Sequence, residues 1–120
     1  LQTLILCENK IEFIDKDFFN YLNHLKMLDL NGNGLKNIAD HSFTDLNQLK
    51  KLNLANGFLE TITEKLFKGL ENLKDLCLAN NKIFHIEDNA FGSLNSLAIL
   101  NLKSNNLYNI DQRKLTGLFN

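Results

Sequence analysis

Leucine and isoleucine recur along the chain at intervals that divide it into five segments of 24 residues, 1–24, 25–48, 49–72, 73–96 and 97–120. Positions 1, 4, 6 and 22 of the segment hold leucine in all five copies, position 11 holds leucine or isoleucine, and position 14 holds isoleucine. Position 19 holds Phe19, Phe43, Phe67 and Phe91, followed by Leu115. Self-similarity at a fixed period of this size predicts an array of stacked repeat units.

Each unit is predicted to contain one short strand. Around positions 4 and 6 apolar residues alternate with polar ones, which is the pattern of a strand with one buried face. The other apolar positions are too irregular for one long helix, so the chain is expected to turn and run back with its apolar side chains inward. One such coil cannot bury its own apolar face, whereas stacked coils can. The strands are therefore predicted to form one parallel sheet, with the phenylalanines in a column behind it.

Position 9 follows the predicted strand and holds asparagine in every segment except the third. A side-chain amide has both donors and an acceptor, so it can satisfy buried backbone groups of its own coil and of the adjacent one. We therefore predict a structural asparagine ladder, formed by Asn9, Asn33, Asn81 and Asn105 and broken by Gly57.

The stretch LANGFLETI, residues 54–62, contains this break. Its Asn-Gly pair is typical of a hairpin turn, but the 24-residue register places it in the same slot as residues 78–86, so a strand exit is predicted instead. We expect backbone groups to be left unsatisfied there, with faster amide exchange at residues 55–59 than at 79–83. Filling of the gap by Asn56 or water is one alternative. Room made by Gly57 for Phe58 or for a partner's backbone is another.

These columns, written L-x-x-L-x-L-x-x-N-x-[IL]-x-x-I-x-x-x-x-F-x-x-L-x-x, resemble the leucine-rich repeat family in its 24-residue class over the whole chain. The class is similar to the repeats of Toll-like receptor ectodomains, Slit-type modules, small leucine-rich proteoglycans and jawless-fish antigen receptors. The resemblance implies a curved, right-handed leucine-rich repeat solenoid, with a parallel β-sheet on the concave face and loops or short 3-10 turns on the convex face. It also implies an extracellular recognition role.

Composition and charge narrow the function classes. A hydrophobic content of 44% and a formal net charge of −1 fit a globular protein and exclude a generic polyanion binder, so no nucleic-acid partner is expected. No apolar run approaches the ~20 residues of a membrane span, so this segment is not expected to insert into a membrane. No cofactor is expected.

The two cysteines, Cys7 and Cys77, fall in the first and fourth segments. Three strand spacings separate them by roughly 14 Å, which is too far for a disulfide bond. The disulfide-bonded caps that extracellular relatives carry are absent. We therefore expect residues 1–120 to be one solenoid without its terminal caps and a fragment of a longer array.

Positions 3, 5, 7 and 8 of each segment, with Ala55 and Ala79 at position 7, are predicted to face outward from the concave sheet. Mixed polar side chains with scattered apolar ones are typical of a protein-binding surface, and equally of any solvated sheet. The candidate ligand-binding residues on this face are Met27, Asp29, Lys51, Asn53, Asp75, Cys77, Ile99 and Asn101.

Three further surface features stand out. Phe58, Phe84 and Tyr108 lie just after consecutive strands and form a candidate flank aromatic patch. It could anchor a partner, although packing over the loop edges is the favoured interpretation.

Lysines share position 2 in three segments, and we interpret them as part of a mixed, hydrated rim. Positions 15–17 carry a mildly acidic convex edge: Asp15, Asp17, Asp40, Glu64, Glu87, Asp88 and Asp111.

Enzymatic and metal-binding motifs are not found. His24, His41 and His85 occupy different positions of the segment, and none combines with a cysteine or carboxylate at metal-ligand spacing. The NGNG stretch at residues 31–34 is a strand exit in the repeat register and not a phosphate-binding loop. The sequence therefore predicts a protein that is not an enzyme and has no metal site.

The leading hypothesis is a noncovalent protein-recognition module of an extracellular receptor or secreted binding protein, with the innate-immune and signalling roles that the resemblance implies. Its partner would be a protein ligand or co-receptor. The alternatives are a structural spacer or dimerisation segment of a longer receptor ectodomain, and a cytosolic leucine-rich repeat scaffold.

Overall fold

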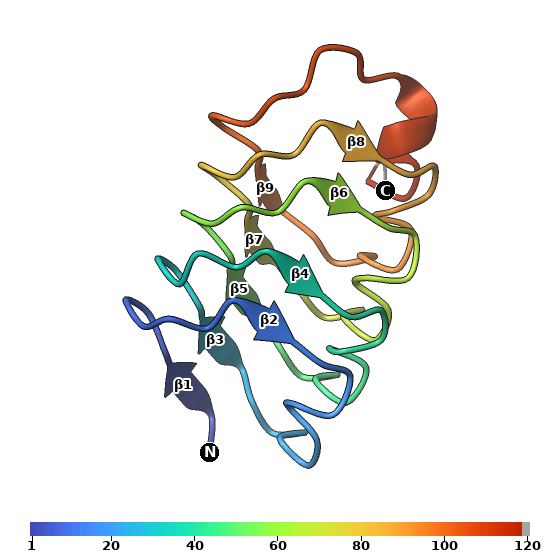
Figure 1. Cartoon of the computed structure of the whole chain (residues 1–120). Helices are drawn as coiled ribbons and strands as arrows, with labels where there is room; N and C mark the ends of the chain where they lie inside the picture. The colour runs from blue at the N-terminus through green and yellow to red at the C-terminus, as the bar shows by residue number, and fades with distance from the viewer. Residues whose placement is uncertain (119–120) are drawn as a thin grey trace.

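The chain winds as a right-handed solenoid in which each turn of the chain stacks on the one before it (Figure 1). The computed structural model describes residues 1–118. One row of three-residue strands comprises β1 (Thr3–Ile5), β3 (Met27–Asp29), β5 (Lys51–Asn53), β7 (Asp75–Cys77) and β9 (Ile99–Asn101). These strands form a five-stranded sheet in the order β1-β3-β5-β7-β9. We refer to segments 1–24, 25–48, 49–72, 73–96 and 97–118 as coils 1 to 5.

The register of the sheet repeats the period of the sequence. All pairings are parallel, and Leu4 pairs with Leu28, which pairs in turn with Leu52. Leu52 continues to Leu76 and Leu76 to Leu100. The central leucine of each strand points into the core while its two neighbours point out, as the two-residue alternation of a strand requires. The predicted leucine-rich repeat fold is confirmed.

A second row of short strands lies on the flank of the solenoid, a detail that the sequence pattern did not indicate. β2 (Phe13–Ile14) pairs with β4 (Asn37–Ile38), and β6 (Thr61–Ile62) pairs with β8 (His85–Ile86). The remaining return segments are mostly turns, and η1, a 3-10 helix at Gln112–Leu115, is the last element of the described chain (Figure 1). The position-14 isoleucines anchor this row, because each is buried while the preceding residue is exposed.

The core lies between the two rows and is filled by stacked identical side chains. The rings of Phe19, Phe43, Phe67 and Phe91 are fully buried. Their centroids are 5.9, 6.4 and 6.1 Å apart and their planes lie within 20° of parallel. Leucines of the coils fill the space in front of the rings. Because each ring is sandwiched by the same ring from the next coil, the column ties the coils together at the back of the core.

Position-9 asparagines link successive coils through hydrogen bonds to the backbone. Asn81 Nδ2 donates to the carbonyl oxygens of Leu54 in coil 3 and Leu78 in coil 4, and its Oδ1 accepts the N–H of Leu59. Asn33, two coils before, and Asn105, one coil after, make the same three contacts. Asn9 has no preceding coil and bonds within its own coil. Each such side chain satisfies buried backbone groups that would otherwise cost about 1–3 kcal/mol each.

Gly57 occupies position 9 of coil 3, where the other coils have an asparagine. Because Gly57 has no side-chain amide, a backbone group of coil 2 loses its hydrogen-bond partner. The N–H of Leu35, the counterpart of the Leu59 N–H, finds no acceptor within residues 1–118, although Leu35 is only 1% exposed. Asn56 does not fill the gap, because its Nδ2 donates to Asn31 Oδ1 at the surface. The N–H groups of residues 56–59 all donate hydrogen bonds. The weak point therefore lies at Leu35 and not, as the sequence suggested, at residues 55–59.

The flank row is also interrupted between coils 2 and 3, because β4 and β6 do not pair. A hollow of about 210 Å³ opens there, lined by residues that include Ile38, Glu60 and Thr61. Coils 2 and 3 therefore lack both the ladder amide and the flank pairing that join coils 3 and 4. We call this junction the coil 2–3 seam.

The phenylalanine column gives a first prediction. Phe67→Ala should lower the free energy of unfolding by about 3–5 kcal/mol, because it removes a fully buried ring that is stacked on both faces. Phe13→Ala is the matched control, since Phe13 is 63% exposed, and its effect should stay below about 1 kcal/mol. Urea denaturation followed by circular dichroism measures both, and equal losses would contradict the proposed role of the column.

The coil 2–3 seam gives a second prediction. The Leu35 amide should exchange with solvent about five- to tenfold faster than the Leu59 amide, which is the factor expected for one missing hydrogen bond of about 1 kcal/mol. Hydrogen exchange followed by NMR resolves the two amides, and Ile83, whose N–H is bonded to Asn105 Oδ1, is the internal control. Equal protection at all three sites would show that the missing amide has no energetic consequence.

Candidate functional site

The outer surface of the five-stranded sheet is built from the two residues that flank each buried leucine. The residue before the leucine is Met27 in β3, Lys51 in β5 and Asp75 in β7, and these three lie side by side in register. Lys51 is exposed, whereas Met27 and Asp75 are half-buried. Ionic, polar and apolar groups are therefore packed at the spacing of adjacent strands, about 4.8 Å.

A shallow hollow of about 190 Å³ lies on this face. Five predicted site residues border it, namely Met27, Lys51, Asn53, Asp75 and Cys77. The floor is the buried Leu28 and Leu52. Asp29, Ile99 and Asn101 lie on the same sheet outside the hollow, with Ile99 exposed at one end and Ile5 at the other. The sheet thus presents a depression of mixed polar and apolar lining between two exposed apolar side chains.

Three of the predicted site residues also have a structural role that sequence reasoning missed. Asp29, Asn53 and Asn101 each accept, through Oδ1 at 3.0 Å, the backbone N–H of the residue two positions further on. This is the Asx-turn contact, which bends the chain as it leaves the strand. The repeated Asp or Asn at position 5 was the signal that could have revealed it. Cys77 occupies the same position in β7 but has no such side-chain oxygen.

One part of the predicted face is wrong. Ala55 and Ala79, at position 7, are 7% and 6% exposed and belong to the core edge. The next residue of every coil has a positive φ angle, between 56° and 75°, which turns the chain inward toward the asparagine ladder. Asn56, and not Gly57, adopts this left-handed conformation in LANGFLETI. The Asn-Gly pair is therefore no hairpin turn. In these coils position 7 is buried, while Asn56 and Asn80 at position 8 are exposed as predicted.

The three flank aromatics are exposed. Phe58 is 52% exposed, Phe84 48% and Tyr108 86%. Phe84 and Tyr108 border a common hollow of about 110 Å³ next to β8, which Phe58 does not line. Phe58 lies over Gly34, where a Cβ atom would meet its ring at 3.4 Å. No stacking joins these three rings in the described chain.

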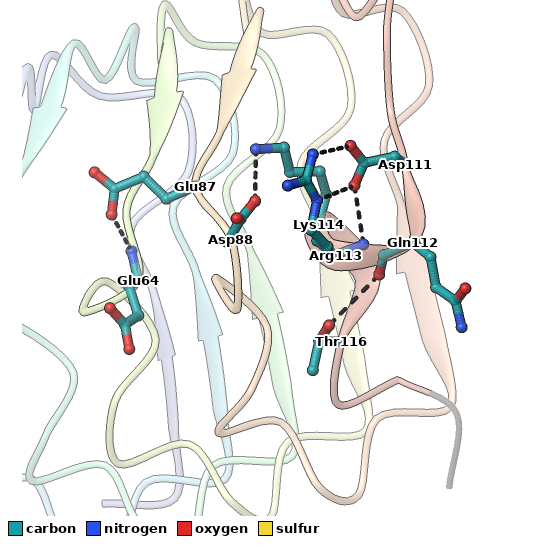
Figure 2. Close-up of polar contacts among 8 residues, drawn as sticks. All are labelled: Glu64, Glu87, Asp88, Asp111, Gln112, Arg113, Lys114 and Thr116. Atoms are coloured by element: carbon teal, nitrogen blue, oxygen red, sulfur yellow. Dashed lines mark hydrogen bonds and ion pairs between the residues drawn. The ribbon is translucent and has the colours of Figure 1, made fainter.

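The acidic convex edge is occupied by local contacts. Glu87 Oε2 accepts the backbone N–H of Glu64, and Asp88 pairs with Lys114 at 2.7 Å (Figure 2). Asp111 caps η1 by accepting the N–H of Arg113, whose guanidinium it also binds. The hydrogen bond from that guanidinium lowers the pKa of Asp111 and raises the pKa of Arg113. These carboxylates hold turns and a helix end in place.

Other kinds of site have no counterpart in the described chain. No group of three or more histidine, cysteine or acidic side chains within residues 1–118 is arranged to hold a metal ion. Within the same range, no helix has the length and apolar character that crossing a membrane would require. Cys7 and Cys77 are free thiols and both are half-buried.

Comparison with known proteins agrees with the geometry. A family model described as leucine rich repeat matches residues 1–56 and again residues 47–107. No curated protein matches the chain significantly. A chain of the Drosophila Toll–Spatzle complex is similar with a TM-score of 0.83 and 21% identity, over 93% of this chain and 20% of that one. A chain of the TLR13–ssRNA13 complex is similar with a TM-score of 0.52 and 22% identity, over 98% and 23%.

At these identities the two structural likenesses show the fold alone. This chain spans about a fifth of the length of the solved chains that it matches. What those proteins bind is therefore information about them, and the binding surface of this chain has to be argued from its own residues.

The Asx turns give a third prediction. Asn53→Ala should lower the free energy of unfolding by about 1 kcal/mol, because the Ala55 N–H loses its acceptor. Asn53→Asp keeps the oxygen, as Asp29 shows at the same position of β3, and should leave stability nearly unchanged. Thermal denaturation of the two variants checks this, and equal losses would mean that the turn contact contributes nothing.

Proposed function

The chain belongs to the leucine-rich repeat family, and on that premise we propose that it is a noncovalent protein-recognition module of an extracellular receptor or secreted binding protein. A solenoid of this kind offers an extended, rigid surface on which recognition needs no large rearrangement. The sheet face, with its hollow at Met27, Lys51 and Asp75, is the surface that we assign to the protein ligand or co-receptor.

The single observation that carries this proposal is the mixed chemistry of that hollow. Lys51 and Asp75 are paired across adjacent strands with opposite charge, while Met27 beside them and the exposed Ile99 offer apolar contact. Apolar anchors within a polar rim are typical of protein–protein interfaces. A site of one charge sign, which a polyphosphate chain would need, is not what this face presents.

The partners named for the two structural neighbours are compatible with a protein ligand for this chain but do not decide the class of ligand. One neighbour comes from a complex of Toll with Spatzle and the other from a complex of TLR13 with RNA. Both neighbours were solved as complexes, one with a protein and one with an RNA. We propose no enzymatic role, because a leucine-rich repeat solenoid is a binding scaffold.

The proposal is tested by site-specific photo-cross-linking in the full-length protein. A photoreactive benzoylphenylalanine placed at Lys51 should give a cross-linked product of discrete mass with the native protein partner. The same group placed at Glu64, an exposed residue on the convex edge, is the control and should give none. Lys51 is preferable to Asn53, because a substitution at Asn53 also removes an Asx turn.

Charge-reversal variants test the same proposal through the binding affinity. Lys51→Glu and Asp75→Lys should each weaken binding of the cross-linked partner about tenfold, the equivalent of about 1.4 kcal/mol, without changing the unfolding temperature. Affinity can be measured by surface plasmon resonance with the full-length protein. No cross-link from Lys51, together with unchanged affinity in both variants, would contradict the proposal and leave the spacer or dimerisation role.

A further inference from the structure

Three lysines stand in a row on the rim where the chain enters the sheet. Lys26 directly precedes β3, Lys50 precedes β5 and Lys74 precedes β7. Their backbones are joined to one another, since the N–H of Lys50 donates to the carbonyl of Lys26 at 2.8 Å and the N–H of Lys74 to that of Lys50 at 2.9 Å. The three residues, which we call the lysine ladder, therefore advance by one strand spacing, about 4.8 Å per step.

The ammonium groups of the lysine ladder have no partner within the described chain. All three side chains are exposed and none forms an ion pair with any of residues 1–118. Among residues 1–118 only Lys36, Arg113 and Lys114 pair with carboxylates, so the lysine ladder differs from the other unpaired lysines in its regular row at strand spacing and not in lacking a partner. The carboxylates that could compete for the ladder are Asp29, whose Oδ1 is bound to the Asn31 N–H, and the nearby Glu71 and Asp75, which are not ion-paired with it.

Like charges on adjacent strands repel each other, and a step of about 5 Å lies well within the screening length of about 8 Å at physiological ionic strength. An anion that bridged neighbouring lysines would relieve this repulsion. The sheet fixes the spacing of the three backbones, so the flexible side chains start from points that are aligned before any ligand binds.

A surface hollow of about 310 Å³ accompanies the lysine ladder. It is lined by Lys26 and Lys50 together with the side-chain amides of Gln48 and Asn72. Gln48 and Asn72 stand two residues before Lys50 and Lys74, whereas His24 holds that place before Lys26. Asn72 Nδ2 already donates to the Asn47 carbonyl oxygen at 2.7 Å, so its Oδ1 is the atom left to accept a hydrogen bond from a ligand. The lining thus combines cations with neutral hydrogen-bonding groups and contains no carboxylate and no aromatic ring.

We propose that the lysine ladder is a binding site for a linear sulfated polysaccharide. Successive sulfate groups would engage successive lysines, while the amides of Gln48 and Asn72 would bond to sugar hydroxyls. This site goes beyond the proposed function, because it lies on the rim beside the sheet face and takes a different class of ligand.

Single-stranded nucleic acid is the less suitable polyanion. Proteins that bind it combine a basic groove with aromatic side chains on which bases stack. None of the exposed aromatic side chains in the described chain lines the hollow; they are Phe13, Phe18, Tyr21, Phe58, Phe84 and Tyr108. The net charge of −1 argued against a generic polyanion binder, but it is an average over differently charged surfaces. Carboxylates of the acidic edge bond to groups in nearby turns, whereas the lysine ladder is unpaired.

The test uses the full-length protein and a heparin-derived octasaccharide, with binding followed by isothermal titration calorimetry. The triple variant Lys26→Gln, Lys50→Gln, Lys74→Gln should weaken binding at least tenfold. Restoring Lys50 alone should steepen the dependence of log affinity on log salt by about one unit, as expected for one ionic contact. The unfolding temperature should stay unchanged or rise, because three repelling charges are removed from exposed positions.

The matched control is Lys10→Gln, Lys65→Gln, Lys82→Gln, which removes the same charge from exposed lysines elsewhere and should change affinity less than twofold. A hyaluronan octasaccharide, which lacks sulfate, should bind at least tenfold more weakly than the heparin fragment. The proposal is overturned by no binding to the wild-type protein, by equal loss in the two triple variants, or by tighter binding of a single-stranded RNA of equal charge. The cross-linking result at Lys51 is independent of all three outcomes.

Discussion

A coil of 24 residues cannot bury its own apolar face, and every other feature of this protein depends on that constraint. The leucines of one coil are covered only when the next coil lies directly over them in register. The consequence is visible at the ends, where Leu4, Leu6, Leu100 and Leu102 remain partly exposed while their counterparts in coils 2 to 4 are buried. Stability is therefore a property of junctions between coils, as expected for a solenoid whose units contact only their neighbours.

The junctions are not equivalent. Between coils 3 and 4 the sheet, the flank strands, the phenylalanine stack and the Asn81 amide all contribute. Between coils 2 and 3 the sheet and the stack remain, but the amide and the flank pairing are missing. A Cβ atom at Gly57 would lie 2.8 Å from Asn81 Oδ1 and 3.1 Å from the Leu35 carbonyl oxygen, so the backbone occupies space that a side chain would need. The glycine thus serves close approach and not a left-handed turn.

The same stacking organises the surface into rows. Residues at the same position of successive coils lie in a row at strand spacing. One row on the sheet face is Met27, Lys51 and Asp75, and the row on the rim is Lys26, Lys50 and Lys74. Each row has its own chemical character, which is mixed on the sheet face and cationic on the rim. The rigidity of the sheet supplies spacing, and the variable positions of the repeat supply chemistry. Protein recognition and sulfated-glycan binding are proposals about these two rows.

The sequence by itself determined the repeat length, the parallel sheet, the stacked phenylalanines and the positions that face outward in the strand, because burial of an apolar face imposes a strict period on the residues. It could not determine which outward residues share a hollow, because that depends on the packing of neighbouring coils. Nor could it show that Asp29 and Asn53 hold turns, that Ala55 and Ala79 are buried, or that the lysines lack partners. Those outcomes depend on competition among several acceptors within a few ångströms, which only the tertiary structure decides.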